Sequence, residues 1–289
     1  MNLWILLADQ PLLFLSMAAV LGLLVGSFLN VLVHRLPIML ERQWQREAQE
    51  ALGLPIQTHA PLNLCLPASH CPHCNHRIRA WENIPVLSYL ALRGRCSACR
   101  VKISVRYPLV ELGCAGLTLL AAWHAGPTLQ ALALMLLGWS LLALSLIDIE
   151  HQLLPDALVL PMLWLGLIVN AFELFVPLDQ ALWGAVCGYL SLWTVFWLFK
   201  LVTGKDGMGY GDFKLMALIG AWGGWQVLPL TLMLASVVGA LAGLCLLRWR
   251  NASMGTAMPF GPYLAIAGWI ALLWGGEIST FYLQLIGFS

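Results

Sequence analysis

The stretch Gly209-Tyr210-Gly211-Asp212-Phe213-Lys214 decides how the chain is organised, because it places a carboxylate between two long apolar runs. Glycine permits turns and the close approach of another backbone, so the two glycines leave room beside Asp212. An ionisable side chain at membrane depth is costly to bury, and such residues commonly mark functional sites. A single carboxylate does not define a reaction, whereas a second carboxylate close to it would.

The composition predicts an all-α polytopic membrane protein. Of the 289 residues, 60% are hydrophobic and only 10% are charged, and the mean hydropathy is +0.81. A soluble domain of this size could not bury so much apolar surface. The first apolar run lacks a basic start, so we predict no cleavable signal peptide. The net charge of +1 is uninformative, and we expect no nucleic-acid partner.

Eight apolar segments are predicted to cross the membrane, each near the roughly 20 residues that a membrane helix requires. Short breaks rich in Gly, Pro and Asn separate them. The shortest break, Gly223-Gly224-Trp225-Gln226, is read as a turn but could belong to a bent helix. The predicted spans cover residues 12–33, 108–124, 129–147, 154–176, 181–201, 213–228, 230–247 and 260–284.

The basic residues predict the orientation. With the N-terminus outside, the cytoplasmic loops are 34–106, 202–212 and 248–259, and they contain or border all 15 Lys and Arg residues. The outer loops contain none, as the positive-inside rule requires. Asp148 then lies at the cytoplasmic end of the third span and Asp212 at the cytoplasmic start of the sixth. The topology therefore places both carboxylates near one membrane face.

Two carboxylates held close together cannot both ionise cheaply, so they share a proton and titrate as a pair. The ionised partner can take a proton from water while the protonated partner donates a hydrogen bond to a peptide carbonyl. This chemistry is that of an aspartic protease. Carboxylates at helix ends are also often helix caps or solvated groups. Other titratable residues lie close to the two aspartates in the sequence and are alternative candidates: Glu150, His151, Asp156 and Asp206.

Four of the eight cysteines form two Cys-x-x-Cys pairs in the polar segment 34–106. Their four thiolates can close a tetrahedral zinc shell, which would fold a loop too small to form its own core. The 21 residues between the pairs slightly exceed the commonest spacing of about 15–20. A redox dithiol is the alternative, although no βαβ pattern surrounds the first pair. The predicted metal ligands are Cys71, Cys74, Cys96 and Cys99, with His70, His73 and His76 as further conceivable ligands.

Other features have plainer interpretations. Gly26-Ser27-Phe28-Leu29-Asn30-Val31 is typical of a helix-packing surface in a membrane. Pro259-Phe260-Gly261-Pro262 indicates an irregular start to the last span. Residues 41–52 predict a charged, solvated helix, and the role of residues 41–61 stays open. The remaining cysteines in apolar spans are expected to pack: Cys114, Cys187 and Cys245.

Taken in order, these motifs resemble a type IV prepilin peptidase, the bifunctional leader peptidase/N-methyltransferase family. The resemblance is carried by Asp148 with Leu-Pro-Asp ending at Asp156, by residues 209–214, by Gly26 to Pro37 and by the two cysteine pairs. It covers the chain from Gly26 to about Pro262. The tetrapeptide alone also occurs in presenilin-type proteases, but this chain lacks their Tyr-Asp pair and Pro-Ala-Leu turn.

The resemblance implies an enzyme of the bacterial inner membrane whose active sites face the cytoplasm. It would cleave the basic leader from type IV prepilins and type II secretion pseudopilins, then methylate the new N-terminal residue, usually phenylalanine, using S-adenosylmethionine. Asp148 and Asp212 would be catalytic, and Cys71, Cys74, Cys96 and Cys99 would bind Zn²⁺. The implied divisions are a first membrane helix (1–33), a zinc loop linked to methyl transfer (34–106) and a peptidase core (107–289).

Two alternatives stay open. The first is a leader peptidase without methyltransferase activity, against which the intact cysteine loop argues. The second is a non-catalytic assembly or transport protein that uses its acids for proton coupling and its cysteine loop for docking. In that case Asp148 and Asp212 need not approach one another. The sequence defines neither the residues that hold S-adenosylmethionine nor the oligomeric state.

Overall fold

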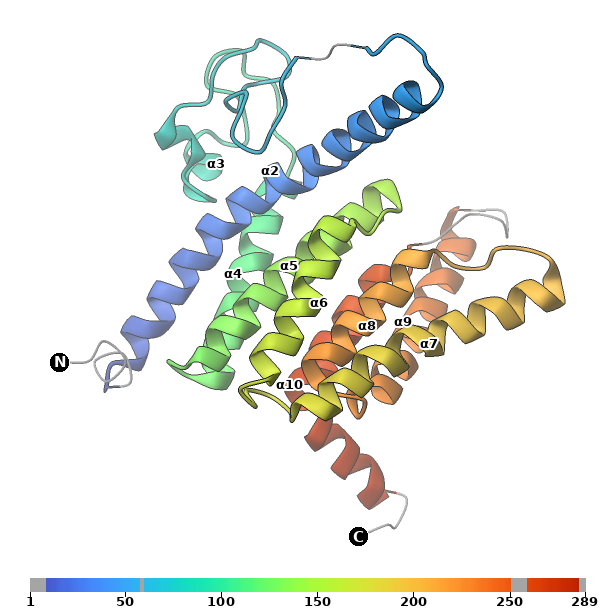
Figure 1. The fold of residues 1–289 in the computed structure, drawn as a ribbon. Coiled ribbons are helices and arrows are strands. Elements are labelled where there is room, and N and C mark those ends of the chain that lie inside the picture. Colours follow the sequence, from blue (N-terminus) through green and yellow to red (C-terminus); the bar gives the residue numbers. More distant parts are fainter. Residues whose placement is uncertain (1–8, 58–59, 251–258, 286–289) are drawn as a thin grey trace. The chain divides into compact units, whose positions relative to one another are not determined.

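The computed structural model describes residues 9–57, 60–250 and 259–285, and within these ranges the chain is helical with two isolated β-bridges (Figure 1). This confirms the prediction of an all-α protein. The chain divides into two compact units, Met1–Trp139 and Ser140–Ser289. The helices are α2 (Pro11–Ala51), η1 (Ala80–Asn83), α3 (Leu87–Ala91), α4 (Arg106–Ala125), α5 (Leu129–His151), α6 (Asp156–Asn170), α7 (Leu178–Thr203), α8 (Tyr210–Gly223), α9 (Val227–Arg250) and α10 (Gly261–Leu285).

Six helices in the described ranges are long and apolar enough to cross a membrane: α2, α4, α5, α7, α9 and α10. The predicted spans 154–176 and 213–228 were too long, because α6 has 15 residues and α8 has 14. At 1.5 Å per residue these helices measure about 22 and 21 Å, less than the roughly 30 Å of a hydrocarbon core. The described ranges therefore contain six full-length candidate spans, and α6 and α8 are shorter helices at the positions of the other two predicted spans.

In the first unit, α2 is one helix of 41 residues that continues through Pro37. The charged, solvated helix predicted for residues 41–52 is confirmed as far as Ala51, but it is continuous with the first span, so the helix does not end at residues 34–37 as predicted. At about 62 Å, α2 is twice the hydrocarbon thickness, so its second half extends beyond the membrane. α2 packs tightly on α4: a Cβ added to Gly26 would lie 2.7 Å from the Cα of Glu111. This contact confirms the predicted packing surface at Gly26.

In the second unit, α8 forms the core and contacts α6, α7, α9 and α10. Every residue from Leu215 to Gly223 is buried, which explains how so short a helix is accommodated: the other helices surround it. The backbones of Gly184 on α7 and Gly220 on α8 meet directly, leaving no room for a Cβ on either. The predicted turn after α8 is confirmed, because Gly224 has a φ of 75° and α9 begins at Val227.

Asn170 ties the end of α6 to the end of α8. Its amide group donates to the carbonyls of Ala221 at 2.9 Å and Trp222 at 3.0 Å. Its carbonyl accepts from the backbone amides of Phe175 and Val176 at 3.1 and 3.2 Å. A buried amide is stable only when its polar groups are paired, as they are here. This contact holds α8 in register within the unit.

Candidate active site and metal centre

The second unit brings the two predicted aspartates together. Asp148 lies in the last turn of α5, and Asp212 lies in the first turn of α8. Their side chains are buried, with residue exposures of 6% and 7%, and they are close enough for their charges to interact. Two carboxylates separated by 64 positions thus occupy one site. Their catalytic roles stay predictions.

The start of α10 completes the surroundings of Asp148. The backbone amide of Gly261 donates to Oδ2 of Asp148 at 3.0 Å. A Cβ on Gly261 would lie 2.6 Å from the same oxygen, so a larger residue could not occupy this position without moving the carboxylate. Pro259 and Phe260 precede α10, which confirms the irregular start predicted for the last span. Sequence reasoning missed the contact itself, since no local signal connects Gly261 with a residue 113 positions earlier.

Two of the competing acids, Asp156 and Asp206, have cationic partners. Asp156 accepts two bonds from the ammonium group of Lys214, at 2.7 and 2.8 Å. Asp206 pairs with Lys200 at 2.8 Å. Among the described residues, no cation pairs with Asp148. The same is true of Asp212 within those ranges, so both members of the pair are buried acids without a counter-charge, the arrangement expected of reactive carboxylates.

The four predicted metal ligands also come together, in the first unit. Their sulfur atoms all lie within 4.8 Å of one another. The Sγ atoms of Cys71 and Cys99 are 3.8 Å apart, and those of Cys74 and Cys96 are 3.9 Å apart. A tetrahedron of thiolates around zinc, with Zn–S distances of about 2.3 Å, has edges of about 3.8 Å. The donor set and its spacing therefore fit a four-coordinate metal ion.

The two cysteine pairs occupy equivalent turns. The amide of Cys71 donates to the carbonyl of His76, and the amide of Cys96 donates to the carbonyl of Val101, both at 2.9 Å. An antiparallel bridge flanks each turn, one between residues 70 and 77 and the other between residues 95 and 102. This pairing of two Cys-x-x-Cys turns confirms a zinc-ribbon-like loop.

The turns favour ionised thiols at the first cysteine of each pair. Hydrogen bonding to the backbone of Cys74, then to that of His73, lowers the pKa of Cys71 to about 7. Backbone hydrogen bonds within its own turn likewise lower the pKa of Cys96. At Cys74, a hydrogen bond with the His76 backbone favours the thiolate, but burial and the neighbouring thiols raise the pKa to about 12. A bound cation would supply the charge needed for all four to ionise.

Known proteins match the chain along most of its length. Residues 20–125 match the bacterial peptidase A24 N-terminal domain, and residues 135–244 match the type IV leader peptidase family. A prepilin leader peptidase/N-methyltransferase of Pseudomonas putida is 72% identical over 288 residues, covering 100% of both chains. The proteins of the same name from Stutzerimonas stutzeri and Pseudomonas aeruginosa are each 66% identical, covering 96% and 98% of both chains. The chain belongs to the type IV leader peptidase family.

Membership confirms the resemblance inferred from the motifs, and this leader peptidase family member is an enzyme. The six membrane-capable helices found among the residues that the structure describes make it a membrane protein. No solved structure matches the chain.

Arg35 holds part of the polar loop of this leader peptidase family member in place, and the sequence predicted no role for it. The buried guanidinium of Arg35 on α2 donates to three backbone carbonyls of the polar loop, those of Asn63 at 2.9 Å, Leu64 at 3.3 Å and Pro67 at 2.7 Å. The guanidinium presents several N–H donors in a fixed planar arrangement, which suits a cluster of backbone carbonyls. The sequence signal that could have indicated this role is the position of the arginine, directly after the first predicted membrane span. Arg35 thus attaches the segment before the cysteine turns to α2.

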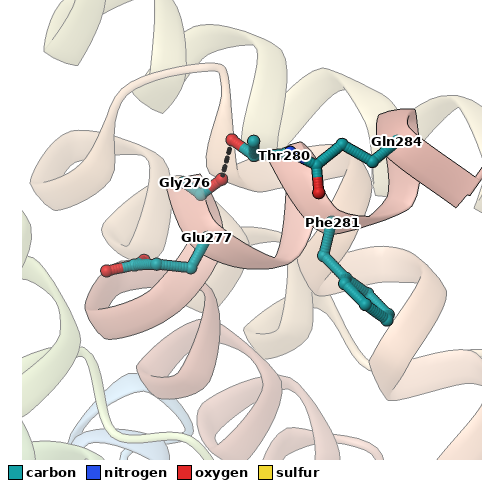
Figure 2. Close-up of a pocket in the computed structure, with 5 residues that line it drawn as sticks. All are labelled: Gly276, Glu277, Thr280, Phe281 and Gln284. Atoms are coloured by element: carbon teal, nitrogen blue, oxygen red, sulfur yellow. Dashed lines mark hydrogen bonds between the residues drawn. The ribbon is translucent and has the colours of Figure 1, made fainter. Parts of the chain in front are cut away.

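An open depression on α10 lies apart from the aspartates (Figure 2). All its lining residues come from this one helix, and the Thr280 hydroxyl donates to the Gly276 carbonyl at 2.8 Å. Gly276 is 15 residues beyond Gly261, or about 22 Å along the helix. None of the predicted site residues lines the depression, whose members are Gly276, Glu277, Thr280, Phe281 and Gln284.

Proposed function

We propose that this enzyme removes the basic leader from type IV prepilins and type II secretion pseudopilins and then methylates the new N-terminal residue. The names of the relatives, which combine leader peptidase with N-methyltransferase, support both steps. The observation that carries the peptidase assignment is the buried pair Asp148 and Asp212, which lacks a cationic partner among the described residues. Both reactions would occur at the cytoplasmic face of the bacterial inner membrane.

In the proposed cleavage, the ionised member of the pair takes a proton from water, and the resulting nucleophile attacks the scissile carbonyl carbon. The protonated member donates a hydrogen bond to the carbonyl oxygen. The C–N bond breaks as the leaving amine gains a proton, and no covalent enzyme intermediate forms. The Gly261 amide would hold one oxygen of Asp148 and so orient its carboxylate during this sequence.

The substrate class fits this location. A prepilin has a basic leader followed by an apolar helix. The helix can lie in the bilayer while the leader stays in the cytoplasm, which would present the scissile bond near the membrane surface. Asp148 and Asp212 are predicted to lie at that level, at the cytoplasmic ends of their helices.

In the proposal, Cys71, Cys74, Cys96 and Cys99 hold a structural Zn²⁺ that stabilises the loop 34–106. We assign methyl transfer, with S-adenosylmethionine as donor, to this loop. The remainder of the chain, residues 107–289, would be the peptidase core, and residues 1–33 the first membrane helix. No nucleic acid takes part.

Mass spectrometry of a purified prepilin incubated with the enzyme in detergent, with and without S-adenosylmethionine, tests both activities. We expect loss of the leader in both samples and one added methyl group only with the donor. Asp148→Asn and Asp212→Asn should each reduce cleavage by at least about 10³-fold, within the range for acid–base groups. Asp206→Asn is the matched control, because its ion pair is exposed and should contribute little.

Cleavage without methylation would remove the transferase part of the proposal. Full cleavage by both aspartate variants would remove the two-carboxylate mechanism. If a folded enzyme does not cleave a matched prepilin at all, the non-catalytic assembly role becomes the better interpretation.

A further inference from the structure

A stripe of exposed apolar side chains runs along η1 and α3 in the first unit. Trp81, Ile84, Leu87 and Leu90 recur every third residue, and their exposures are 53%, 44%, 64% and 64%. Leu87 and Leu90 are three apart on α3 and so lie on the same side of that helix, whereas Trp81 belongs to η1 and Ile84 to the non-helical segment between the two helices. We call these four residues the apolar stripe. Large apolar side chains gathered on a surface mark an interaction site.

A hydrogen bond to α4 fixes the position of this stripe along the axis of that membrane helix. The backbone amide of Val86 donates to Oε2 of Glu111 at 2.8 Å, and Glu111 is buried. Glu111 is five residues into α4, about 7–8 Å along the axis from Arg106. α4 has 20 residues, or about 30 Å, so it needs its whole length to cross the hydrocarbon. The bond therefore places Val86 and the adjoining Leu87 beside the second turn of α4, within about 7–8 Å of the end of the helix that begins at Arg106.

The backbone at this attachment point is strained. Val86 has φ 59° and ψ −47°, and the amide of Leu87 donates to the carbonyl of Pro85 at 2.5 Å. This is a γ-turn with positive φ, a conformation that is rare for any residue and especially costly for a β-branched one. Such strain persists only where surrounding contacts hold it. The bond to Glu111 is such a contact, so the direction in which α3 leaves the turn is set by α4.

The charge around the stripe identifies its partner. Residues 77–106 contain seven basic residues and one acid, Glu82. A basic prepilin leader would be repelled by this surface, whereas anionic lipid headgroups complement it. Glu82 does not neutralise the surface, because it is engaged by the Arg79 backbone at 2.8 Å and by His76 at 3.3 Å. Six of the basic residues are exposed: Arg77, Arg79, Arg93, Arg95, Arg100 and Lys102.

We propose that the apolar stripe inserts into the cytoplasmic leaflet at headgroup level and that the surrounding basic residues bind anionic phospholipid. Interfacial segments of this kind bury their apolar side about 5–10 Å deep while their cations stay among the headgroups. The stripe and the Val86–Glu111 bond together anchor the cysteine loop to the membrane surface. The proposal does not depend on which reaction the enzyme catalyses.

Hydrogen exchange of the full chain, read by mass spectrometry, tests the proposal in nanodiscs of two compositions. One contains phosphatidylcholine alone, and the other contains phosphatidylcholine with phosphatidylglycerol. No substrate is added. We expect exchange across residues 80–92 to be at least about fivefold slower in the anionic discs, since each basic residue near such a surface adds to the attraction. Exchange within α8, which is buried, should be the same in both.

Matched variants separate insertion from general effects of reduced hydrophobicity. Leu87→Gln with Leu90→Gln should abolish the protection, and Arg77→Gln with Arg79→Gln should weaken it. The control is Leu52→Gln with Leu54→Gln, which replaces exposed apolar residues of the same polar loop and should leave the protection intact. Unchanged metal content would show that each variant keeps its cysteine turns.

Equal exchange of residues 80–92 in both disc types would overturn the proposal. Protection that appears only when a prepilin is added would also overturn it, because the occupant of the stripe would then be a protein.

Discussion

At the scale of single residues, their partners distinguish the ion-paired carboxylates Asp156 and Asp206 from the buried pair proposed to be catalytic. Asp156 and Asp206 have ammonium partners, so their charges are offset. Asp148 instead receives one backbone amide bond from Gly261 and is buried next to Asp212. Leaving a buried charge without a counter-ion costs several kcal/mol. Selection for stability alone would remove such a pair, which supports a catalytic role for it.

Gly261→Ala should reduce prepilin cleavage by about 10–100-fold, because misplacing a catalytic group by even 1 Å can cost that much. The added Cβ would lie 2.6 Å from Oδ2 of Asp148 and force the carboxylate to move. The measurement is the initial rate of leader removal by enzyme in detergent. Gly276→Ala is the control on the same helix, where a Cβ would meet nothing within 4 Å. Equal rates for the two variants would show that the position of Asp148 does not limit cleavage.

At the scale of helices, close backbone packing replaces the hydrophobic driving force that is absent between helices in lipid. α2 approaches α4 through Gly22 and Gly26, and α7 approaches α8 through Gly184 and Gly188. In both pairs the glycines are four residues apart, so they lie on one helix face. Each unit therefore contains a helix pair whose close backbone approach depends on glycine.

Gly26→Ala should destabilise the protein by about 1–3 kcal/mol, the usual cost of overpacking. The new methyl group would lie 2.7 Å from the Cα of Glu111. A backbone atom cannot move aside by changing rotamer, as a side chain can. Thermal unfolding in detergent would show a lower midpoint. Gly113→Ala, on α4 with nothing within 4 Å, should leave the midpoint unchanged or raise it. A neutral result for Gly26→Ala would mean that the two helices separate at little cost.

The cysteine turns should hold one zinc ion per chain, measurable by elemental analysis of the purified protein. Cys71→Ser should remove the ion, because three thiolates no longer close the tetrahedral shell. Cys65→Ser should retain it, since Cys65 is exposed and outside the cluster. Chelation should speed hydrogen exchange across residues 71–76 and 96–101. Zinc retained at full occupancy by Cys71→Ser would contradict the four-thiolate site.

At the scale of the whole molecule, charge distribution should set the orientation in the membrane. All 15 Lys and Arg residues lie in or beside the three loops predicted to be cytoplasmic. Only short loops close to helix ends count in this rule, and the loops after α7 and α9 are of that kind. The predicted loop 34–106, which includes the second half of α2, contains ten of these basic residues.

Fusion of alkaline phosphatase, which is active only outside the cytoplasm, tests this orientation. A fusion after Val176, between α6 and α7, should be active. A fusion after Lys205, between α7 and α8, should be inactive. Green fluorescent protein at the same two positions is the control and should give the opposite pattern. Reversed activities would place the aspartates at the outer face and exclude cytoplasmic cleavage.

The sequence by itself determined the protein class, the four cysteines that could hold a metal ion and the candidate acids. These properties depend on composition and on short-range spacing: a mean hydropathy of +0.81, two Cys-x-x-Cys pairs and Asp212 among glycines. The structure confirms the helical class and the four-cysteine cluster, and it brings the two aspartates together.

Only the tertiary structure decided the lengths of α6 and α8, the continuation of α2 through Pro37 and the contacts that hold the sites. A short helix is possible for α8 because other helices bury it, and burial is a property of neighbours that local sequence does not encode. Gly261 and Asp148 are 113 positions apart, and Val86 and Glu111 are 25 apart. Such pairs form because helix packing brings distant backbone amides to buried carboxylates, which no local periodicity can predict.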